Sequence, residues 1–225
     1  MTKKTYLILL VFLLSDLAFS FYQHYHMPLY GDVAEIVIPD QVKGYYHVLH
    51  DPLGLDVLIR NETYANPNRY FAHWSASQYF LHMPLLLQKF VSPIDSIYLS
   101  VALAKIIIQL LVLYLLAVFV SGTGNILKPD FLLAAALMTF LFQTSGYNRY
   151  MGIIDPSVIY SFFYALPLGL LLLFFLPFFR RIYYSHHNKP GIAAWIALAL
   201  FIPVLCLNGP LVPGVVLIAC PLVLL

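Results

Sequence analysis

The chain has 225 residues, of which 61% are hydrophobic and 10% are charged, and its mean hydropathy is +0.83. An average soluble domain is roughly 45–50% apolar and about 25% charged, so this composition excludes a soluble enzyme and a disordered tail. A formal net charge of +2 is too small to attract a polyanion, which excludes nucleic acid as a partner. The composition therefore predicts an integral membrane protein surrounded by membrane lipids.

Six apolar runs are candidates for membrane-spanning helices, each of which needs about 20 mostly apolar residues. They cover residues 5–21, 97–120, 131–144, 157–179, 192–207 and 211–225. We expect an all-α, multi-pass transmembrane bundle of five or six spans that forms a single domain over residues 1–225. Because the last run is still apolar at residue 225, we also expect this domain to continue in a longer protein.

The first run has two interpretations. Lys3 and Lys4 precede it, and Ala18-Phe19-Ser20 near its end has the small residues of a signal-peptide cleavage site. Asp16 inside the run and Phe21 after it favour an anchor that is not cleaved. Both interpretations place the segment that follows on the far side of the membrane.

Basic residues in short loops indicate the orientation, because cytoplasmic loops carry an excess of Lys and Arg. With the N-terminus in the cytoplasm, the cytoplasmic segments contain all the following basic residues: Lys3, Lys4, Lys128, Arg180, Arg181 and Lys189. The long loop over residues 22–96 then lies outside. We expect the protein to reside in the plasma (inner) membrane in this orientation.

The long outer loop, residues 22–96, holds seven of the ten acidic residues and six of the eight histidines. Structureless loops longer than about 12–15 residues are uncommon unless they are functional or disordered, and the aromatic content argues against disorder. Prolines and Asp or Asn residues punctuate the loop at intervals typical of short helices, near residues 33–38, 40–50 and 66–84. Trp and Tyr in the last of these favour helices that lie in the headgroup region.

The sequence Tyr30-Gly31-Asp32-Val33-Ala34-Glu35 is the main candidate site in this loop. Residues three apart lie on one face of a helix, so Asp32 and Glu35 form a carboxylate pair close to the outer membrane surface. Such a pair can accept a proton from an attacking hydroxyl group. The same spacing is also a variant of the capping box, in which both side chains only satisfy free backbone amides. A cap also fixes its side chain in place, so the two interpretations are compatible.

Histidines three or fewer residues apart raise the question of a metal site. His24 and His26 flank Tyr25, and His47 and His50 share one face of an expected helix. Such spacings can bind zinc, but no cysteine and no HExxH-type signature accompanies them. We therefore assign no metal ligands.

Ionisable residues near the later spans form a second group of candidates. Arg149 lies in the second outer loop, and its planar guanidinium suits a phosphate. Asp155 precedes Pro156-Ser157 at the start of the fourth run, where it either caps the helix or contacts a ligand. Lys105 lies inside the second run, and it either extends to the surface or faces the protein interior, where Asp16 is a candidate partner.

The layout resembles the GT-C superfamily of integral-membrane glycosyltransferases: one N-terminal span, a long first outer loop with interfacial helices, then closely spaced spans. In that superfamily an acidic residue early in the first outer loop lies at the active site. The matching position is Asp32 in Tyr30-Gly31-Asp32, with Glu35 as its companion. The entry to the fourth run, Asp155-Pro156-Ser157 followed by Phe162-Phe163, is also similar to such enzymes.

The resemblance implies a reaction in which an acceptor hydroxyl attacks a sugar carried on a polyprenyl phosphate, the lipid-linked donor. Asp32 would be the general base, and Arg149 or Lys105 would stabilise the phosphate that leaves. Some branches of the superfamily use a divalent metal and others do not, so the cofactor stays open. The acceptor and the sugar stay open too.

Two other classes of protein compete with this interpretation. A transporter or channel segment would explain Lys105 and Asp16 within the spans, and the helix-breaking prolines Pro167, Pro177 and Pro203. A non-catalytic scaffold would use the outer loop to bind a partner protein. The sequence shows no internal repeat, and its polar residues are concentrated outside the spans, which favours the glycosyltransferase.

Overall fold

The computed structural model describes residues 1–30, 32–38, 44–62, 67–143, 153, 155–183, 191–209 and 211–224. Within these ranges the chain forms helices and no strand, which confirms the all-α prediction. Three helical segments are long and apolar enough to cross a membrane, so the chain is a membrane protein. They are α1 (Lys3–His26), α6 (Pro93–Ser121), and the π-helical turn η3 (Ser161–Ala165) continued by α9 (Leu166–Tyr183).

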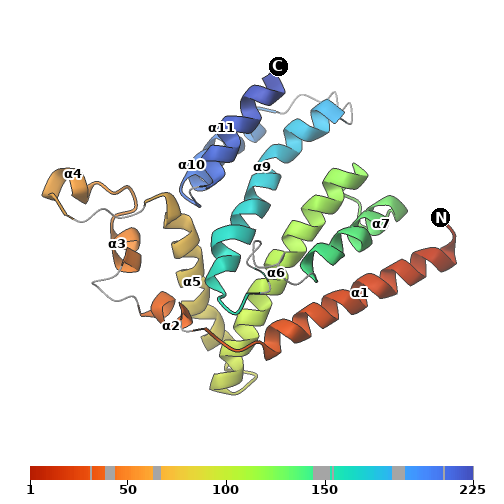
Figure 1. Ribbon diagram of the computed structural model, residues 1–225, viewed down its shortest axis with the longest axis horizontal. Coiled ribbons are helices and arrows are strands. Elements are labelled where there is room, and N and C mark those ends of the chain that lie inside the picture. Colours follow the sequence, from red (N-terminus) through yellow and green to blue (C-terminus); the bar gives the residue numbers. More distant parts are fainter. Residues whose placement is uncertain are drawn as a thin grey trace.

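Shorter helices connect and follow these segments (Figure 1). Between α1 and α6 lie α2 (Asp32–Val37), α3 (Gly44–His50), α4 (Asp56–Arg60), the 3₁₀ turn η1 (Pro67–Arg69) and α5 (Tyr70–Leu87). Between α6 and α9 lie α7 (Pro129–Met138) and the 3₁₀ turn η2 (Thr139–Phe142). The chain then forms α10 (Ile192–Cys206) and α11 (Leu211–Leu224).

The structure differs from the helices expected from the sequence in three places. Helix α1 continues to His26, so the segment that follows begins later than residue 22. Helices α10 and α11 have 15 and 14 residues, which is about 22 Å of helix against a hydrocarbon layer of about 30 Å. The count of five or six spans therefore stays a prediction. Helix α5 includes Pro84 and runs on to Leu87. Proline lacks an N–H and so removes one hydrogen bond from the helix, but its carbonyl still accepts from the Gln88 amide at 3.0 Å.

Helix α6 is the centre of the bundle, and α1, α5, α7 and α9 all pack against it (Figure 1). Val112 in its middle is fully buried. The main core also joins the outer-loop helices to the bundle, since its buried residues include Ile36, Phe80, Val101, Ala104, Ile108, Phe142, Val158 and Phe162. Helices α2 and α5 are therefore packed into the bundle core, whereas α4 protrudes from it (Figure 1).

Local sequence explains where α6 begins and ends. The Ser92 hydroxyl accepts a hydrogen bond from the Asp95 amide at 3.2 Å and donates to the Asp95 carboxylate at 2.7 Å. Pro93 occupies the first turn, where its missing N–H costs nothing. Gly122 ends the helix with φ of 70°, a left-handed conformation that glycine adopts without strain.

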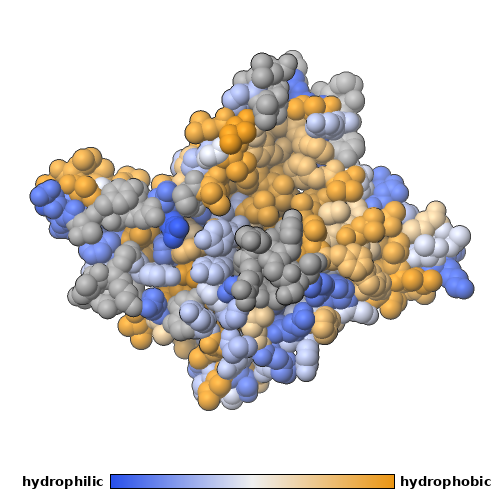
Figure 2. All heavy atoms as spheres, viewed as in Figure 1, coloured by the Kyte–Doolittle hydropathy of each residue, from blue (hydrophilic) through white to orange (hydrophobic). Residues whose placement is uncertain are grey.

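The surface divides by hydropathy (Figure 2). Hydrophobic residues cover much of the part formed by α9, α10 and α11, whereas hydrophilic residues are frequent toward the end of the bundle where α6 begins. Helix α4 also exposes apolar side chains, among them Leu58 and Ile59. Large apolar side chains such as Leu200 and Leu217 are 70% and 74% exposed. Exposed apolar area of this extent is typical of a surface that faces lipid.

Close packing of α9 on α6 gives a test of the bundle. A Cβ atom on Gly169 would lie 3.1 Å from Leu111 Cδ2 and 3.5 Å from Val112 Cγ2, whereas one on Gly214 in α11 would meet nothing within 4 Å. We expect Gly169→Leu to lower the free energy of unfolding in detergent by about 1–3 kcal/mol, because overpacking forces the helices apart. Gly214→Leu is the matched control, and equal losses in denaturant titrations of the two variants would contradict this packing.

Candidate functional site

Helix α2, which carries the two predicted catalytic residues in its sequence, packs against the bundle. It begins at Asp32, a few residues after α1 ends at His26, and contains Glu35, which is half-buried. The Asp32 side chain lies outside the described part of the chain. Ile36 is 2% exposed and packs in the same core as Phe80 and Ala104. The helix is therefore anchored against α5, close to the start of α6 at Ile97.

An apolar pocket of about 610 Å³ lies between α2, α5 and the start of α6. This volume is within the usual range of small-molecule sites, roughly 300–1,000 Å³. Its lining is almost entirely apolar: Leu29, Tyr30, Val33, Ala34, Val37, Ile38, Phe80, Leu81, Pro84, Leu85, Gln88 and Ile97. Helix α2 thus turns one apolar face to the pocket and buries Ile36 in the core, and Glu35 is not part of the lining.

The structure brings Lys105 and Asp155 together. Lys105 is fully buried, and its ammonium donates a hydrogen bond to the backbone carbonyl of Asp155. The same ammonium lies 3.5 Å from the Met27 sulfur, just beyond the end of α1. Lys105 therefore does not extend to the surface, and it lies at the end of the bundle where α2 begins.

The Asp155 carboxylate has a local role. It accepts a hydrogen bond from the Ser157 amide at 2.9 Å and so stabilises the turn that leads into α9. The contact with Lys105 uses the Asp155 carbonyl and not its carboxylate. Arg149, the other predicted contact for a phosphate, lies outside the described residues, so its role stays a prediction.

A ladder of polar side chains runs between α1 and its neighbours. Asp16, Ser20 and His24 are four residues apart and therefore share one face of α1. His24 Nε2 is 3.2 Å from Gln109 Oε1, and the Gln109 amide donates to the Ser20 hydroxyl at 3.2 Å. Gln143 also donates to Ser20, at 2.6 Å. These bonds satisfy the Ser20 hydroxyl, the Gln109 amide and one ring nitrogen of His24, whereas His24 Nδ1 has no hydrogen-bond partner in the described part of the chain.

The expected pairing of Asp16 with Lys105 is wrong. The Asp16 carboxylate accepts a hydrogen bond from the Thr139 hydroxyl. Lys105 contacts Met27, and the eleven residues between Asp16 and Met27 span about 16 Å of helix. The two charged side chains therefore lie at different depths along α1.

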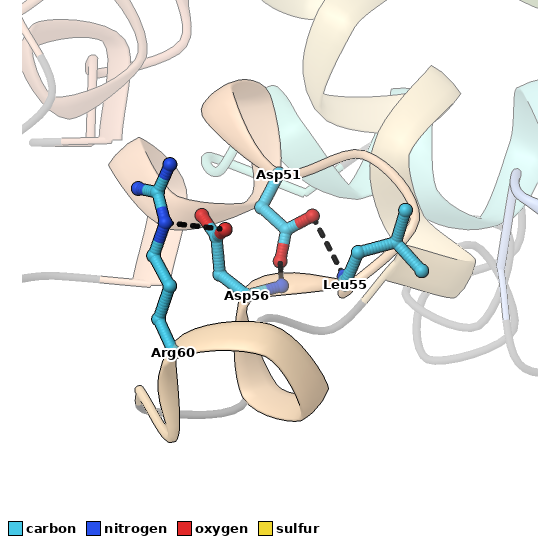
Figure 3. Close-up of polar contacts among 4 residues, drawn as sticks. All are labelled: Asp51, Leu55, Asp56 and Arg60. Atoms are coloured by element: carbon cyan, nitrogen blue, oxygen red, sulfur yellow. Dashed lines mark hydrogen bonds and ion pairs between the residues drawn. The ribbon is translucent and has the colours of Figure 1, made fainter.

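Three other acids of the outer loop stabilise helix starts. The Asp51 carboxylate accepts hydrogen bonds from the Leu55 and Asp56 amides at 2.9 and 3.0 Å, and Asp56 forms an ion pair with Arg60 at 3.4 Å (Figure 3). Asp95 accepts from Ser92 at the start of α6. Local capping thus accounts for Asp51, Asp56 and Asp95, as helix geometry leads one to expect.

One polar cluster was missed by the sequence reasoning, which grouped histidines only by short spacing. The His73 ring, on α5, lies 4.3 Å from the Tyr45 ring and 4.6 Å from the Phe163 ring between centroids. The Arg69 guanidinium lies 5.4 Å from the centroid of the same Phe163 ring. Burial, with a smaller contribution from the Arg69 charge, lowers the pKa of His73 to about 4. The sequence signal that could have predicted this cluster is the spacing of Arg69 and His73, which are four residues apart at the start of an aromatic helix.

Within the described ranges, no group of three or more His, Cys, Asp or Glu side chains is placed to hold a metal ion. Three of the four histidines considered for zinc form hydrogen bonds with other groups, and the fourth, His47, contacts the Tyr46 ring. His24 bonds Gln109, while His26 and His50 bond the backbone carbonyls of Tyr22 and Tyr46 at 2.9 and 2.8 Å. The structure therefore gives no support to a zinc site at these positions.

No known protein family, curated protein or solved structure was found to match this chain. The resemblance to GT-C glycosyltransferases therefore stays a prediction from the sequence. The function must be argued from the geometry of α2, the apolar pocket and the buried Lys105.

Buried His73 predicts an acid-sensitive fold. Its pKa is about 4 in the folded chain and about 6.5 when unfolded, so between these values the unfolded state binds the extra proton. The stability that this group contributes is present above pH 6.5 and is lost as the pH falls toward 4, by on the order of 3 kcal/mol.

We expect the free energy of unfolding of His73→Phe to depend less on pH between 6.5 and 4 than that of the wild type. The measurement is chemical unfolding in detergent at pH 4 to 7. His82→Phe on the same helix is the control, because His82 bonds the Gln78 carbonyl on an exposed face. An unchanged pH dependence in His73→Phe would contradict the assignment.

Proposed function

We propose that this chain is a membrane glycosyltransferase that moves a sugar from a polyprenyl-phosphate carrier to an acceptor at the outer membrane face. The observation that carries the proposal is the apolar pocket of about 610 Å³ formed against α2, the helix that begins with Asp32 and contains Glu35. A polyprenyl chain needs an apolar groove near the membrane surface, and the chemistry needs a carboxylate beside it. In this proposal, helix α2 contributes an apolar face to the groove and carries the carboxylate residues at other positions of the same helix.

In the proposed reaction, an acceptor hydroxyl attacks the anomeric carbon of the sugar. The new glycosidic bond forms as the bond from that carbon to the phosphate oxygen breaks, and the polyprenyl phosphate leaves with the electron pair. Asp32 takes the proton of the hydroxyl as general base, with Glu35 as its companion.

Charge stabilisation at the leaving phosphate is the second part of the proposal. Lys105 lies at the end of the bundle where α2 begins, held by the Asp155 carbonyl and next to Met27. A positive charge in a water-poor site stabilises developing negative charge more strongly than it would in bulk water. Lys105, and Arg149 as predicted from the sequence, are the cations proposed for the phosphate.

The base and the cap can be separated at Asp32. Asparagine is also a good helix cap but accepts no proton at neutral pH, so Asp32→Asn should keep the fold and reduce sugar transfer by about 10²–10⁴-fold. Transfer is measured with a radiolabelled polyprenyl-phosphate sugar. Asp51→Asn, at a carboxylate with a purely local role, is the matched control and should retain activity. Full activity in Asp32→Asn would assign Asp32 to capping alone.

The pocket can be tested with two adjacent leucines of α5. Leu85 lines the pocket and Leu86 does not. Both side chains are largely exposed, at 63% and 50%, so a larger side chain should be tolerated at either position. We expect Leu85→Trp to raise the KM for the lipid-linked donor about tenfold or more, since a filled pocket excludes the chain, while Leu86→Trp changes it little. Similar KM values for the two variants would remove the pocket from the donor site.

A transporter is the second candidate, favoured by the polar ladder inside the bundle. Ionisable and amide side chains within spans mark ion or proton pathways in many membrane proteins. Asp16, His24 and Gln109 lie along α1 and α6 in such an arrangement, with His24 and Gln109 buried.

Substitution at Gln109 separates the two candidates. Gln109→Leu removes the side-chain partner of His24 Nε2 and one of the two amide donors to Ser20, the other being Gln143. In a transporter this change should reduce proton flux into proteoliposomes, read with a pH-sensitive dye, whereas Asp32→Asn should not. In a glycosyltransferase the wild-type protein should show no flux above that of empty vesicles.

A further inference from the structure

Two distant segments of the chain meet at the start of α5. The Phe71 amide of α5 donates a hydrogen bond to the Leu207 carbonyl, in the turn between α10 and α11, at 2.9 Å. A Cβ atom on Gly209 of that turn would lie 3.7 Å from the Phe163 carbonyl. We call this region the α5–α11 junction, and it comprises residues 68–73, Phe163 and residues 208–209.

Three buried polar atoms at this junction have no hydrogen-bond partner in the described part of the chain: Asn68 Oδ1, His73 Nδ1 and Asn208 Oδ1. His73 is 7% exposed and Asn208 is 2% exposed. An unpaired buried polar atom costs about 1–3 kcal/mol, and native proteins satisfy nearly all of them with protein, water or ligand. Three in one place indicate a polar ligand.

The charge at the junction is positive. The Arg69 guanidinium lies over the Phe163 ring, 5.4 Å from its centroid, and is half-buried. Burial keeps His73 neutral, with a pKa of about 4. A neutral imidazole and two amide oxygens pair with hydroxyl groups, whereas a guanidinium pairs with a phosphate.

An apolar cavity of about 220 Å³ between α9 and α11 adjoins the junction, and the four polar residues of the junction are not part of its lining. Its lining includes Phe163 and Gly209 of the junction and continues to Leu171 and Val215. Phe163 and Leu171 are eight residues apart, so the cavity follows α9 for about 12 Å. This helix is one of the three that are long and apolar enough to cross a membrane.

We propose that the α5–α11 junction binds the headgroup of a lipid that carries a phosphate and free hydroxyls, with part of its chain in the cavity between α9 and α11. Asn68, His73 and Asn208 would bond the hydroxyls and Arg69 the phosphate. The site shares no lining residue with the pocket beside α2. It rests on the junction alone and holds whether or not the chain transfers sugars.

Native mass spectrometry of the full chain in detergent tests the site with three short-chain lipids. Phosphatidylglycerol has a phosphate and two hydroxyls, phosphatidic acid has the phosphate alone, and phosphatidylcholine has a neutralised phosphate. We expect phosphatidylglycerol to be retained most strongly. His73→Phe and Asn208→Leu should each weaken its binding about five- to tenfold, to the level of phosphatidic acid, because each removes a hydrogen bond.

A second pair of variants tests the cavity without touching the polar atoms. Val215→Trp fills the cavity and should displace all three lipids, whereas Leu217→Trp, on the exposed face of α11, should displace none. This pair decides the matter if either polar variant fails to fold.

Melting temperatures in delipidated detergent show whether the unpaired atoms matter for another reason. Removing an unpaired buried polar atom should leave the melting temperature of His73→Phe and Asn208→Leu unchanged or raised. Equal retention of the three lipids by the wild type would overturn the proposal. The proposal would also be overturned if His73→Phe and Asn208→Leu melt at a higher temperature yet keep the preference for phosphatidylglycerol, since the atoms that they remove would then not bind the lipid.

Discussion

The polar side chains that α6 buries constrain the rest of the bundle. Neither an apolar core nor lipid offers hydrogen bonds, so each such group needs a partner within the protein. Ser96 and Ser100 bond carbonyls of α6 itself, whereas Gln109 and Lys105 bond other parts of the chain. Gln109 bonds Ser20 and His24 and so fixes the register of α1 against α6. Lys105, one turn away, bonds the carbonyl of Asp155 and so fixes where the chain enters α9. Apolar packing alone permits sliding of one helix along another, whereas these contacts do not.

Helix α5 packs on that framework and contributes to two separate regions of the structure. Its C-terminal half, from Phe80 to Gln88, forms a wall of the apolar pocket beside α2. Its N-terminal half, with Arg69 just before it and His73 in its first turns, meets Phe163 and the α10–α11 turn. A helix that is too polar to count among the candidate spans thus carries the residues of both proposed ligand sites.

The two proposals assign different chemistry to these regions. The pocket beside α2 is apolar and lies against a helix with two carboxylates, an arrangement suited to reaction at a lipid-linked substrate. The α5–α11 junction contains neutral polar atoms and a guanidinium, an arrangement suited to recognition without chemistry. The buried ladder of Ser20, His24 and Gln109 lies deeper, and its recorded hydrogen bonds give it a structural role under either candidate function.

The sequence by itself determined the class of protein, the helical architecture and the position of the central span. Composition and the length of apolar runs are local properties, so the run at 97–120 matched α6 at Pro93–Ser121. Helix α2 covers Asp32–Val37, one residue earlier at each end than the predicted helix over residues 33–38. Only the tertiary structure decided which polar groups meet. Asp16 bonds Thr139 and not Lys105, and His73 joins residues near 163 and 208. These partners lie far apart in the chain, and the packing of helices, which no local spacing encodes, sets their contacts.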